Sequence, residues 1–357
     1  MNHNATQKPF VIPIFIPHAG CPHRCVFCDQ TRTTSHGEQL PGAAQLDETI
    51  TRFLGYRKDA ARYTEISFYG GNFLGLSNDN ISFFLESATR YVCDGRVQGI
   101  RFSTRPDTIT GQRLKLLTRF PVTTIELGVQ SMNDQVLSRS RRGHTAQDIH
   151  HAVTLLKRAS YRLGLQMMVG LPGDTTESAM ATGEQIAQMG PDFVRIYPTL
   201  ILGGSRLAEW YRKGRYHPMD LEEAVALVKN LYVLFVRRQI KVVRMGLQAT
   251  DGFDTGEDLV AGPFHPAFGE LVHSALWLEA ITTKIRNISL RDRKLTIGLN
   301  PRLVSRVKGH HGQNIKILAE EFSLPQIELS TDNRLPLNAI QLNGQLCHPI
   351  KALEENN

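Results

Sequence analysis

The sequence contains no apolar run long enough to cross a membrane. Across 357 residues, no stretch approaches the roughly 20 consecutive apolar residues that a transmembrane helix needs. The N-terminus, MNHNATQK, also lacks the apolar core of a secretory signal peptide. With 41% hydrophobic and 21% charged residues, the composition is typical of a globular protein. We therefore expect a cytoplasmic protein that does not contact membranes.

Cysteine is scarce, and the five cysteines are an odd number. Without a signal peptide, this count argues against a disulfide framework. Cys93 and Cys347 stand alone and are expected to be small, unreactive thiols. The other three, Cys21, Cys25 and Cys28, fall within eight residues. Their clustering, in a chain without internal repeats or low-complexity tracts, is the strongest local pattern in the sequence.

Positive charge is concentrated in one window. The chain has 41 Lys and Arg against 34 Asp and Glu, a formal net charge of +7. Residues 284–316 hold nine basic residues and only Asp292 as an acid, which nets +8, so the remainder is close to neutral. The nine are Lys284, Arg286, Arg291, Arg293, Lys294, Arg302, Arg306, Lys308 and Lys316. Such a window permits nucleic-acid binding.

Short β-branched runs alternate with helical patterns along the first two thirds of the chain. The predicted strands are residues 10–16, 65–69, 99–104, 123–129, 162–169 and 193–197. The predicted helices between them are residues 46–58, 79–92, 107–119, 145–159 and 176–189, with a further helix at 221–239 and strand at 240–245. This alternation predicts an α/β fold with a parallel sheet and right-handed crossovers. Six units are too few to close an eight-fold barrel, so we expect an open, partial barrel.

Three segments are predicted. Residues 1–9 form a flexible N-terminus, 10–283 the barrel with its C-terminal extension, and 284–357 a small basic α/β appendage. The predicted boundary lies near 284–293, where the basic window begins.

The cysteine triplet C-x3-C-x2-C follows the first predicted strand, at the carboxyl edge of the barrel, where active sites gather. Thiolates are the standard ligands of iron–sulfur clusters. Three of them satisfy three irons of a four-iron cluster and leave one iron open. A structural zinc site is the alternative and would need His18 or His23 as its fourth ligand, although structural zinc more often uses pairs of closely spaced ligands.

The triplet on such a barrel resembles the signature of radical S-adenosylmethionine (SAM) enzymes. Further segments resemble a narrower branch, similar to the catalytic subunit of Elongator, which modifies wobble uridines in tRNA. They are IFIPH (14–18), FYGGNF (68–73), STRPD (103–107), ELGVQS (126–131), SRRGHT (140–145) and RIYPTL (195–200). The resemblance runs in order from about residue 10 to about 275.

The resemblance implies a cofactor site. Cys21, Cys25 and Cys28 would ligate a 4Fe–4S cluster whose open iron is chelated by SAM. The expected SAM contacts are Gly70, Gly71, Ser103, Arg105, Gln130, Ser131 and Gly170, at the ends of four successive strands. Their alternative role is ordinary turn formation. An electron from a flavodoxin- or ferredoxin-type donor would cleave SAM to a 5′-deoxyadenosyl radical, which abstracts hydrogen from the substrate. No acid–base pair is expected to be essential.

Two segments beyond the barrel strands supply substrate candidates. Gln248, Asp251 and His265 lie in loops that resemble the same branch and are predicted to contact substrate at the barrel mouth. Turn formation and helix capping are the alternative roles for all three.

The basic window overlaps a possible RNA-binding module. Strand 294–299, short helix 301–307, the loop Gly309-His310-His311-Gly312, helix 314–322 and strand 326–329 follow the order of a KH module, whose G-x-x-G loop clamps nucleotide backbone. Gly309 and Gly312 are therefore RNA-contact candidates. Lys308 stands where KH modules usually have an apolar residue, and a generic helix–turn–helix is the alternative.

These features favour a radical SAM enzyme acting on RNA, specifically tRNA, with no DNA partner expected. The Elongator subunit has a different cysteine spacing and an acetyltransferase domain after its barrel. This chain is too short after the barrel to hold one, so acetyl-CoA use is not expected. One alternative is a radical SAM enzyme on a small molecule such as a porphyrin precursor, although such enzymes usually have a further cysteine where this chain has Gln30. The other is a non-enzymatic iron–sulfur protein that binds RNA.

Overall fold

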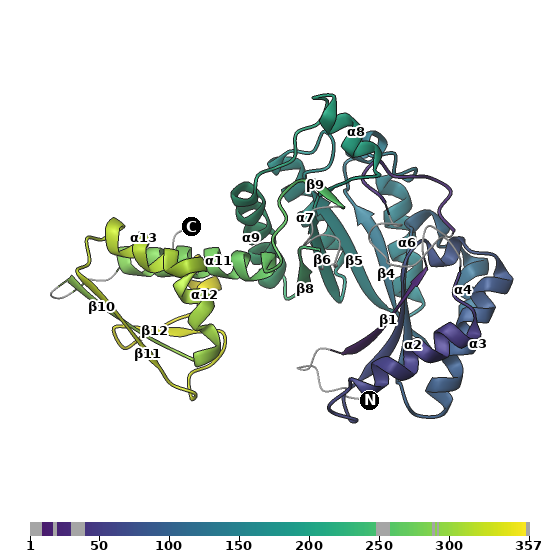
Figure 1. The fold of residues 1–357 in the computed structure, drawn as a ribbon, viewed down its shortest axis with the longest axis horizontal. Helices are drawn as coiled ribbons and strands as arrows, with labels where there is room; N and C mark the ends of the chain where they lie inside the picture. The colour runs from purple at the N-terminus through teal and green to yellow at the C-terminus, as the bar shows by residue number, and fades with distance from the viewer. Residues whose placement is uncertain are drawn as a thin grey trace. The chain divides into compact units, whose positions relative to one another are not determined.

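The computed structural model describes residues 9–16, 20–29, 40–247, 258–287, 290 and 293–354 (Figure 1). The chain forms two compact units. The first unit comprises residues 1–219 and 248–262, and the second unit comprises residues 220–247 and 263–357. The predicted boundary at 283–284 falls inside helix α11 (Phe268–Arg286) of the second unit, so this division differs from the predicted one.

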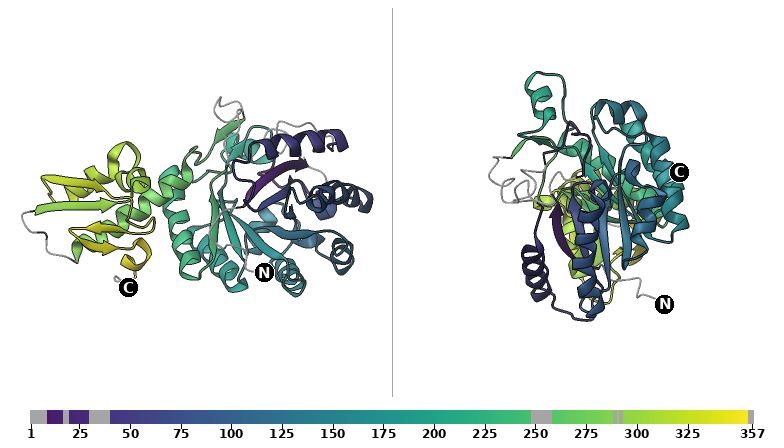
Figure 2. Two further views of the ribbon diagram at one scale, coloured as in Figure 1. Left: turned by 90° about the horizontal axis from the view of Figure 1, so that it is seen from below. Right: turned by 90° about the vertical axis from the view of Figure 1, so that its right-hand side faces the viewer.

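A curled parallel sheet forms the centre of the first unit. The first six of its seven strands lie side by side in sequential order, and each neighbouring pair among these six is parallel. They are β1 (Phe10–Ile16), β2 (Thr64–Gly70), β3 (Gly99–Thr104), β4 (Val122–Gln130), β5 (Arg162–Val169) and β6 (Phe193–Pro198). Figures 1 and 2 show the sheet curving as an open half-barrel with helices along its outer face. The predicted partial barrel is confirmed.

Three long helices of the first unit begin at polar caps. The side chains of Ser77, Thr145 and Thr175 each accept a hydrogen bond from a backbone N–H in the first turn that follows. The helices of this unit are α2 (Ala43–Gly55), α3 (Asn78–Cys93), α4 (Gly111–Leu117), α5 (Asp134–Arg139), α6 (Ala146–Arg158), α7 (Thr176–Met189) and α8 (Arg206–Arg212), with 3₁₀ turns η1 (Phe73–Gly75) and η2 (Pro106–Thr108) and the pair β7 (Ile201–Leu202) and β9 (Leu259–Ala261). The predicted helix 107–119 is divided because Thr110 caps a new helix after the 3₁₀ turn.

An aromatic stack fixes the turn after β2. Phe73 in η1 stacks on Phe102 of β3 and on Phe68 of β2, with ring centroids 4.6 Å and 5.1 Å apart. All three rings are buried. Since a buried aromatic ring contributes large apolar area, this stack holds the segment between Gly71 and Phe73 rigidly at the carboxyl edge of the sheet.

The second unit combines two long helices with a mixed sheet. Its elements are α9 (Leu221–Arg237), β8 (Lys241–Met245), α11, β10 (Lys294–Leu299), η4 (Pro301–Leu303), α12 (Val304–Lys308), η5 (His310–Gly312), α13 (Gln313–Glu321), β11 (Gln326–Thr331), β12 (Ile340–Leu342), β13 (Gln345–Cys347) and α14 (Pro349–Ala352). The four-stranded sheet has the order β11-β10-β12-β13, with β10 parallel to β11. Helix α11 packs against α12, α13 and α14, and Trp277, Leu295 and Leu318 belong to the same buried cluster.

In the parts of the chain that the structure describes, no helix is long and apolar enough to span a membrane.

Candidate functional site

The cysteine loop follows β1 and is fastened to two distant helices. Val26 is fully buried; its N–H donates to the carbonyl of Ser140 (3.1 Å), and its carbonyl accepts from the N–H of Leu207 (2.8 Å). The N–H of Cys28 donates to the carbonyl of Cys25 (3.1 Å), which tightens the turn between them. The loop is therefore fixed to the turn after α5 and to the start of α8.

All three loop cysteines are free thiols. Cys25 is buried, and Cys21 and Cys28 are half-buried. Burial raises the pKa of the Cys21 thiol, and burial together with Cys25 and Cys21 raises the pKa of Cys28 to about 12. Since metal ligation requires thiolates, binding of a cluster would release protons from this loop.

The described residues include no three His, Cys, Asp or Glu side chains that converge on a single ion. A four-iron cluster does not need its cysteines to converge on one ion, because each cysteine binds a different iron. His18, one of the two histidines considered for zinc, lies outside the described residues. The ring of His23 packs against Gly143, where a Cβ atom would come within 2.2 Å of it.

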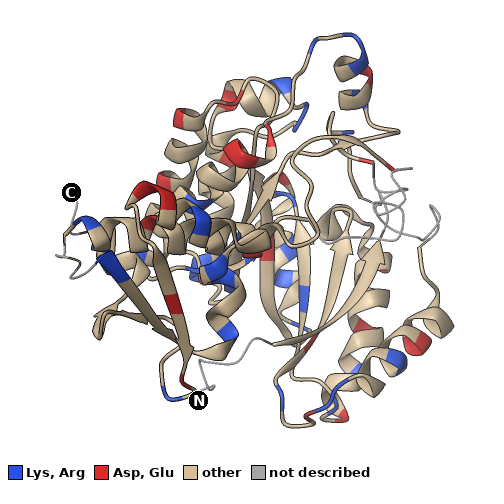
Figure 3. Cartoon of the chain, turned by 60° about the vertical axis from the view of Figure 1, so that its left-hand side comes forward, with Lys and Arg blue, Asp and Glu red and all other residues tan. Residues whose placement is uncertain are grey.

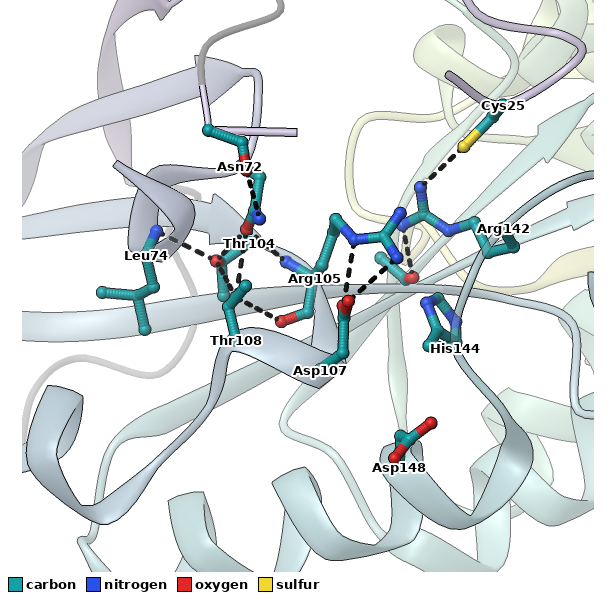
Figure 4. A network of polar contacts seen from close by, with 12 residues as sticks. Cys25, Asn72, Leu74, Thr104, Arg105, Asp107, Thr108, Arg142, His144 and Asp148 are labelled. Atoms are coloured by element: carbon teal, nitrogen blue, oxygen red, sulfur yellow. Dashed lines mark hydrogen bonds and ion pairs between the residues drawn. The ribbon is translucent and has the colours of Figure 1, made fainter. Parts of the chain in front are cut away.

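Asn72, which the sequence analysis did not single out, connects the loop to the sheet. Its Nδ2 donates to the carbonyl of Gly20 (2.9 Å), directly before Cys21. Its Oδ1 accepts from the Thr104 hydroxyl (2.7 Å) and from the backbone N–H of Arg105 (3.0 Å). Asn72 is fully buried, so this amide fixes the start of the cysteine loop relative to the end of β3 (Figure 4). The only sequence signal was its place in the FYGGNF segment.

Two buried arginines lie beside the loop (Figure 4). Arg105 is 2% exposed, and its Nε and Nη2 donate to the two carboxylate oxygens of Asp107 (2.9 and 3.0 Å). Arg142, in the turn after α5, donates from Nη1 to the Cys25 sulfur (3.3 Å) and from Nη2 to the Gly128 carbonyl (2.8 Å). Arg105 directly follows β3, whereas Arg142 was noted in the sequence only as part of SRRGHT.

His144 is buried and electrically neutral. Burial, Arg142 and Arg105 lower its pKa to about 3. Its Nε2 lies 3.3 Å from the carbonyl of Val129 and must carry the proton, because a carbonyl can only accept. The bare Nδ1 is then an acceptor, and no described residue supplies its donor.

Five buried polar atoms around the loop lack a hydrogen-bond partner among the described residues. They are Arg105 Nη1, Gln130 Oε1, Ser140 Oγ, Arg142 Nε and His144 Nδ1. Buried polar groups are nearly always paired, so a group of orphan donors and acceptors indicates a polar ligand. Donors and acceptors are both present, next to three thiols. This mixture fits a cluster together with a zwitterionic cofactor such as SAM.

The other residues predicted to contact SAM lie at strand ends and differ in their backbone conformation and hydrogen bonds. Gly70 has a φ of +103°, and a Cβ there would lie 3.0 Å from the Ile16 carbonyl oxygen, while the N–H of Gly71 donates to that same carbonyl (2.7 Å). This glycine pair therefore lets β2 approach β1 closely. The hydroxyl of Ser103 accepts from Gln166 Nε2 (3.2 Å).

Two further predicted SAM-contact residues, Ser131 and Gly170, accept hydrogen bonds from other residues of the protein. The Ser131 hydroxyl accepts from the N–H of Asn133 (3.1 Å). Gly170 has a φ of +74°, and its carbonyl accepts from the Tyr216 hydroxyl (2.6 Å). Turn formation thus accounts for the backbone of both residues. All seven predicted contacts nevertheless belong to the carboxyl ends of β2 to β5, and Gln130 combines a φ of +68° with an orphan side-chain oxygen.

A buried ion network crosses the inside of the sheet. Glu126 of β4 is fully buried and accepts from Arg195 Nε (2.7 Å), Gln166 Nε2 (2.9 Å), Tyr69 OH (3.0 Å) and Arg101 Nη1 (3.3 Å). Burial alone would raise the pKa of Glu126, but Arg195 and Arg101 outweigh it and lower that pKa. The network is continuous with Ser103 through Gln166, so polar and charged side chains from five strands, β2 to β6, support the site from within.

In the second unit, Gly309 and Gly312 lie on the turn between α12 and α13, with φ of +76° and +74°. A Cβ on Gly309 would come within 2.7 Å of Asn314, whereas a Cβ on Gly312 would meet open space. His265 packs edge-on against His310 of this loop and accepts the N–H of Ala267 (3.0 Å), the turn chemistry considered as its alternative role. Gln248 and Asp251 lie outside the described residues.

Comparisons with known proteins bear on the family of this chain. A family model of the radical SAM superfamily matches residues 15–186, and a model of the Radical_SAM C-terminal domain matches residues 191–277. An uncharacterized protein of Methanocaldococcus jannaschii is 28% identical over 231 residues, covering 62% of this chain and 70% of that protein. A tRNA uridine(34) acetyltransferase of Dehalococcoides mccartyi is 25% identical over 246 residues, covering 60% of this chain and 54% of that protein.

Among solved structures, the archaeal Methanocaldococcus infernus Elp3 with an N-terminal deletion aligns with a TM-score of 0.59 at 20% identity, over 75% of this chain and 62% of that one. This likeness supports the fold. The chain spans about half the length of the acetyltransferase that it matches. With the two family models together extending from residue 15 to 277, the chain belongs to the radical SAM superfamily, in a branch that resembles the catalytic subunit of Elongator.

Proposed function

We propose that this chain is an enzyme that binds a 4Fe–4S cluster through Cys21, Cys25 and Cys28, cleaves SAM, and acts on tRNA. The observation that carries the first part is the anchored cysteine loop beside five orphan polar atoms. When bound, the cluster and SAM together supply a carbon-centred radical that can abstract hydrogen from an unactivated carbon. The electron comes from a donor of the flavodoxin or ferredoxin type.

The residues around the loop offer both hydrogen-bond donors and hydrogen-bond acceptors to a ligand. Arg105 keeps one free N–H group, Nη1, after its bidentate pair with Asp107, and this group is available to a carboxylate. His144 Nδ1 and Gln130 Oε1 are acceptors and suit an ammonium or hydroxyl group. Since these polar atoms are buried, a ligand that pairs with them is also shielded from water.

Two observations support tRNA as the substrate. The matched relatives include proteins named tRNA uridine(34) acetyltransferase. The second unit carries exposed basic residues on β10, η4, α12 and α13 (Lys294, Arg302, Lys308 and Lys316), and also a G-x-x-G turn whose second glycine faces open space (Figure 3). Cationic side chains beside an accessible glycine are suited to a phosphate backbone.

SAM cleavage tests the enzymatic part of this proposal. Anaerobically reconstituted protein with a strong reductant is expected to form 5′-deoxyadenosine from SAM, measured by liquid chromatography and mass spectrometry. A protein that holds an iron–sulfur cluster but forms no 5′-deoxyadenosine would instead be a non-enzymatic iron–sulfur protein.

RNA binding is best tested at Gly312, because a side chain at Gly309 would collide with Asn314. We expect Gly312→Asp to weaken binding of bulk tRNA roughly tenfold, about 1.4 kcal/mol, since it places a negative charge beside the phosphates. Gly312→Asn is the matched control, because Asn and Asp tolerate positive φ similarly and differ in charge. Gel shifts at two salt concentrations measure both variants.

Equal and salt-insensitive binding by wild type, Gly312→Asp and Gly312→Asn would contradict the tRNA assignment for this loop and favour a small-molecule substrate.

A further inference from the structure

Arg142 is the one residue near the cysteine loop whose guanidinium contacts a predicted cluster ligand directly in the described structure. It lies in the turn between α5 and α6 and is only 8% exposed. Its Nη1 donates to the sulfur of Cys25 at 3.3 Å, and its Nη2 is held by the carbonyl of Gly128 at 2.8 Å (Figure 4). The two contacts orient the guanidinium toward the sulfur.

The charge of Arg142 lacks a carboxylate partner among the described residues. The other buried arginines of the first unit are paired: Arg101 with Glu65 (2.7 Å) and Arg105 with Asp107 (2.9 Å). A buried cation without an anion is unfavourable, so a missing negative charge is expected beside it. A cluster core held by three thiolates carries net negative charge, and one-electron reduction adds to that charge.

The surrounding backbone keeps the guanidinium in place. A Cβ on Gly128 would lie 2.6 Å from Arg142 Nη2, so this glycine near the end of β4 provides the space that the side chain occupies. The N–H of Arg142 donates to the carbonyl of Leu137 (2.9 Å), and the carbonyl of Ser140 binds the N–H of Val26 in the cysteine loop (3.1 Å). The turn is therefore closed by its own backbone, and one backbone hydrogen bond fixes it to the cysteine loop beside the Arg142–Cys25 contact.

On the basis of the proposed function, we propose that Arg142 raises the reduction potential of the cluster through its charge and its N–H···S hydrogen bond to Cys25. Hydrogen bonds to cluster sulfurs and the net charge around them are established determinants of cluster potential. A fixed positive charge stabilises the more negative, reduced state. Arg142 thus acts on electron acceptance from the one-electron donor rather than on the substrate.

A redox titration of the reconstituted protein without SAM tests this role. Mediated titration with dithionite, followed by electron paramagnetic resonance, measures the midpoint potential. We expect Arg142→Met to lower the equilibrium constant for one-electron reduction about tenfold, which is about 59 mV toward negative potential. Arg141→Met is the matched control, since Arg141 is adjacent and exposed, and the midpoint potential of this variant should equal that of wild type.

Further variants separate charge from loss of fold. Arg142→Lys keeps the positive charge, and Arg142→Gln keeps only a hydrogen-bond donor. The midpoint potential of the Lys variant should therefore lie above that of the Gln variant. This comparison holds even if Arg142→Met does not retain a cluster. Equal potentials in these variants and wild type would overturn the inference. So would reduced SAM affinity with an unchanged potential, which would assign Arg142 to the SAM carboxylate. A wild-type protein that assembles no cluster would overturn the proposed function as well.

Discussion

Replacing Cys25 with alanine is expected to abolish cluster binding and reduce SAM cleavage to background. Cys25 is the buried member of the triplet, so no solvent ligand can readily substitute for its sulfur. Three thiolates are the minimum that a four-iron cluster with one open iron requires. Iron and sulfide analysis, the visible absorption of the reconstituted protein and 5′-deoxyadenosine formation measure the effect.

Cys93→Ala is the matched control for this experiment. Cys93 is exposed at the end of α3, outside the cysteine loop. This variant should load iron and form 5′-deoxyadenosine as wild type does. Full iron loading in Cys25→Ala would contradict the assignment of the triplet as the cluster ligands. A stoichiometric zinc content that depends on Cys25 would favour the structural zinc alternative.

Replacing Glu126 with alanine is expected to lower the free energy of unfolding by more than any of the other variants does. Glu126→Ala leaves the half-buried Arg195 and the buried Arg101 without their ion pairs to this carboxylate, at 2.7 Å and 3.3 Å. Breaking a buried ion pair from one side destabilises a protein by about 3–5 kcal/mol. Urea denaturation followed by circular dichroism measures the difference. Glu86→Ala, at an exposed position of α3, is the control and should change stability by less than about 0.5 kcal/mol.

The contribution of Glu126 should also depend on pH in a defined direction. Its pKa is lowered in the folded protein, because Arg195 and Arg101 outweigh the effect of burial. The stabilisation is therefore fully present above the unfolded-state pKa, about 4.3 for Glu, and is lost as pH falls through the lower folded value. The stability difference between wild type and Glu126→Gln should be constant near pH 7 and shrink below about pH 4. A difference that grows on acidification would contradict this assignment.

The strands and long helices were predictable because each has a clear local pattern. Strands 99–104 and 162–169 were predicted with the bounds that the structure has, since their apolar, β-branched residues are bounded by turn formers. Helices α5 and α8 were not predicted, because six or seven residues are too few to show an apolar periodicity. Helix α11 was only indicated as a loop feeding a helix, since apolar residues occur around its whole circumference.

The site was predictable only in part. The cysteine spacing and the strand-end glycines are local features, so they could be found without a structure. Asn72 and Arg142 act on residues far away in the chain: Asn72 binds Gly20 and Arg105, and Arg142 binds Cys25 and Gly128. Such side-chain contacts depend on how the loops pack over the sheet, and no spacing rule encodes them.

The order of the β–α units, the three clustered thiols and the basic G-x-x-G segment could be predicted without a structure, because propensity, periodicity and charge are properties of neighbouring residues. Which polar atoms surround the thiols, and which of them lack a partner among the described residues, became apparent only in the folded chain. It also decided that Gly312 is open while Gly309 is filled by Asn314. The physical reason is that burial and hydrogen bonding depend on close packing between elements distant in the chain, which a one-dimensional pattern does not specify.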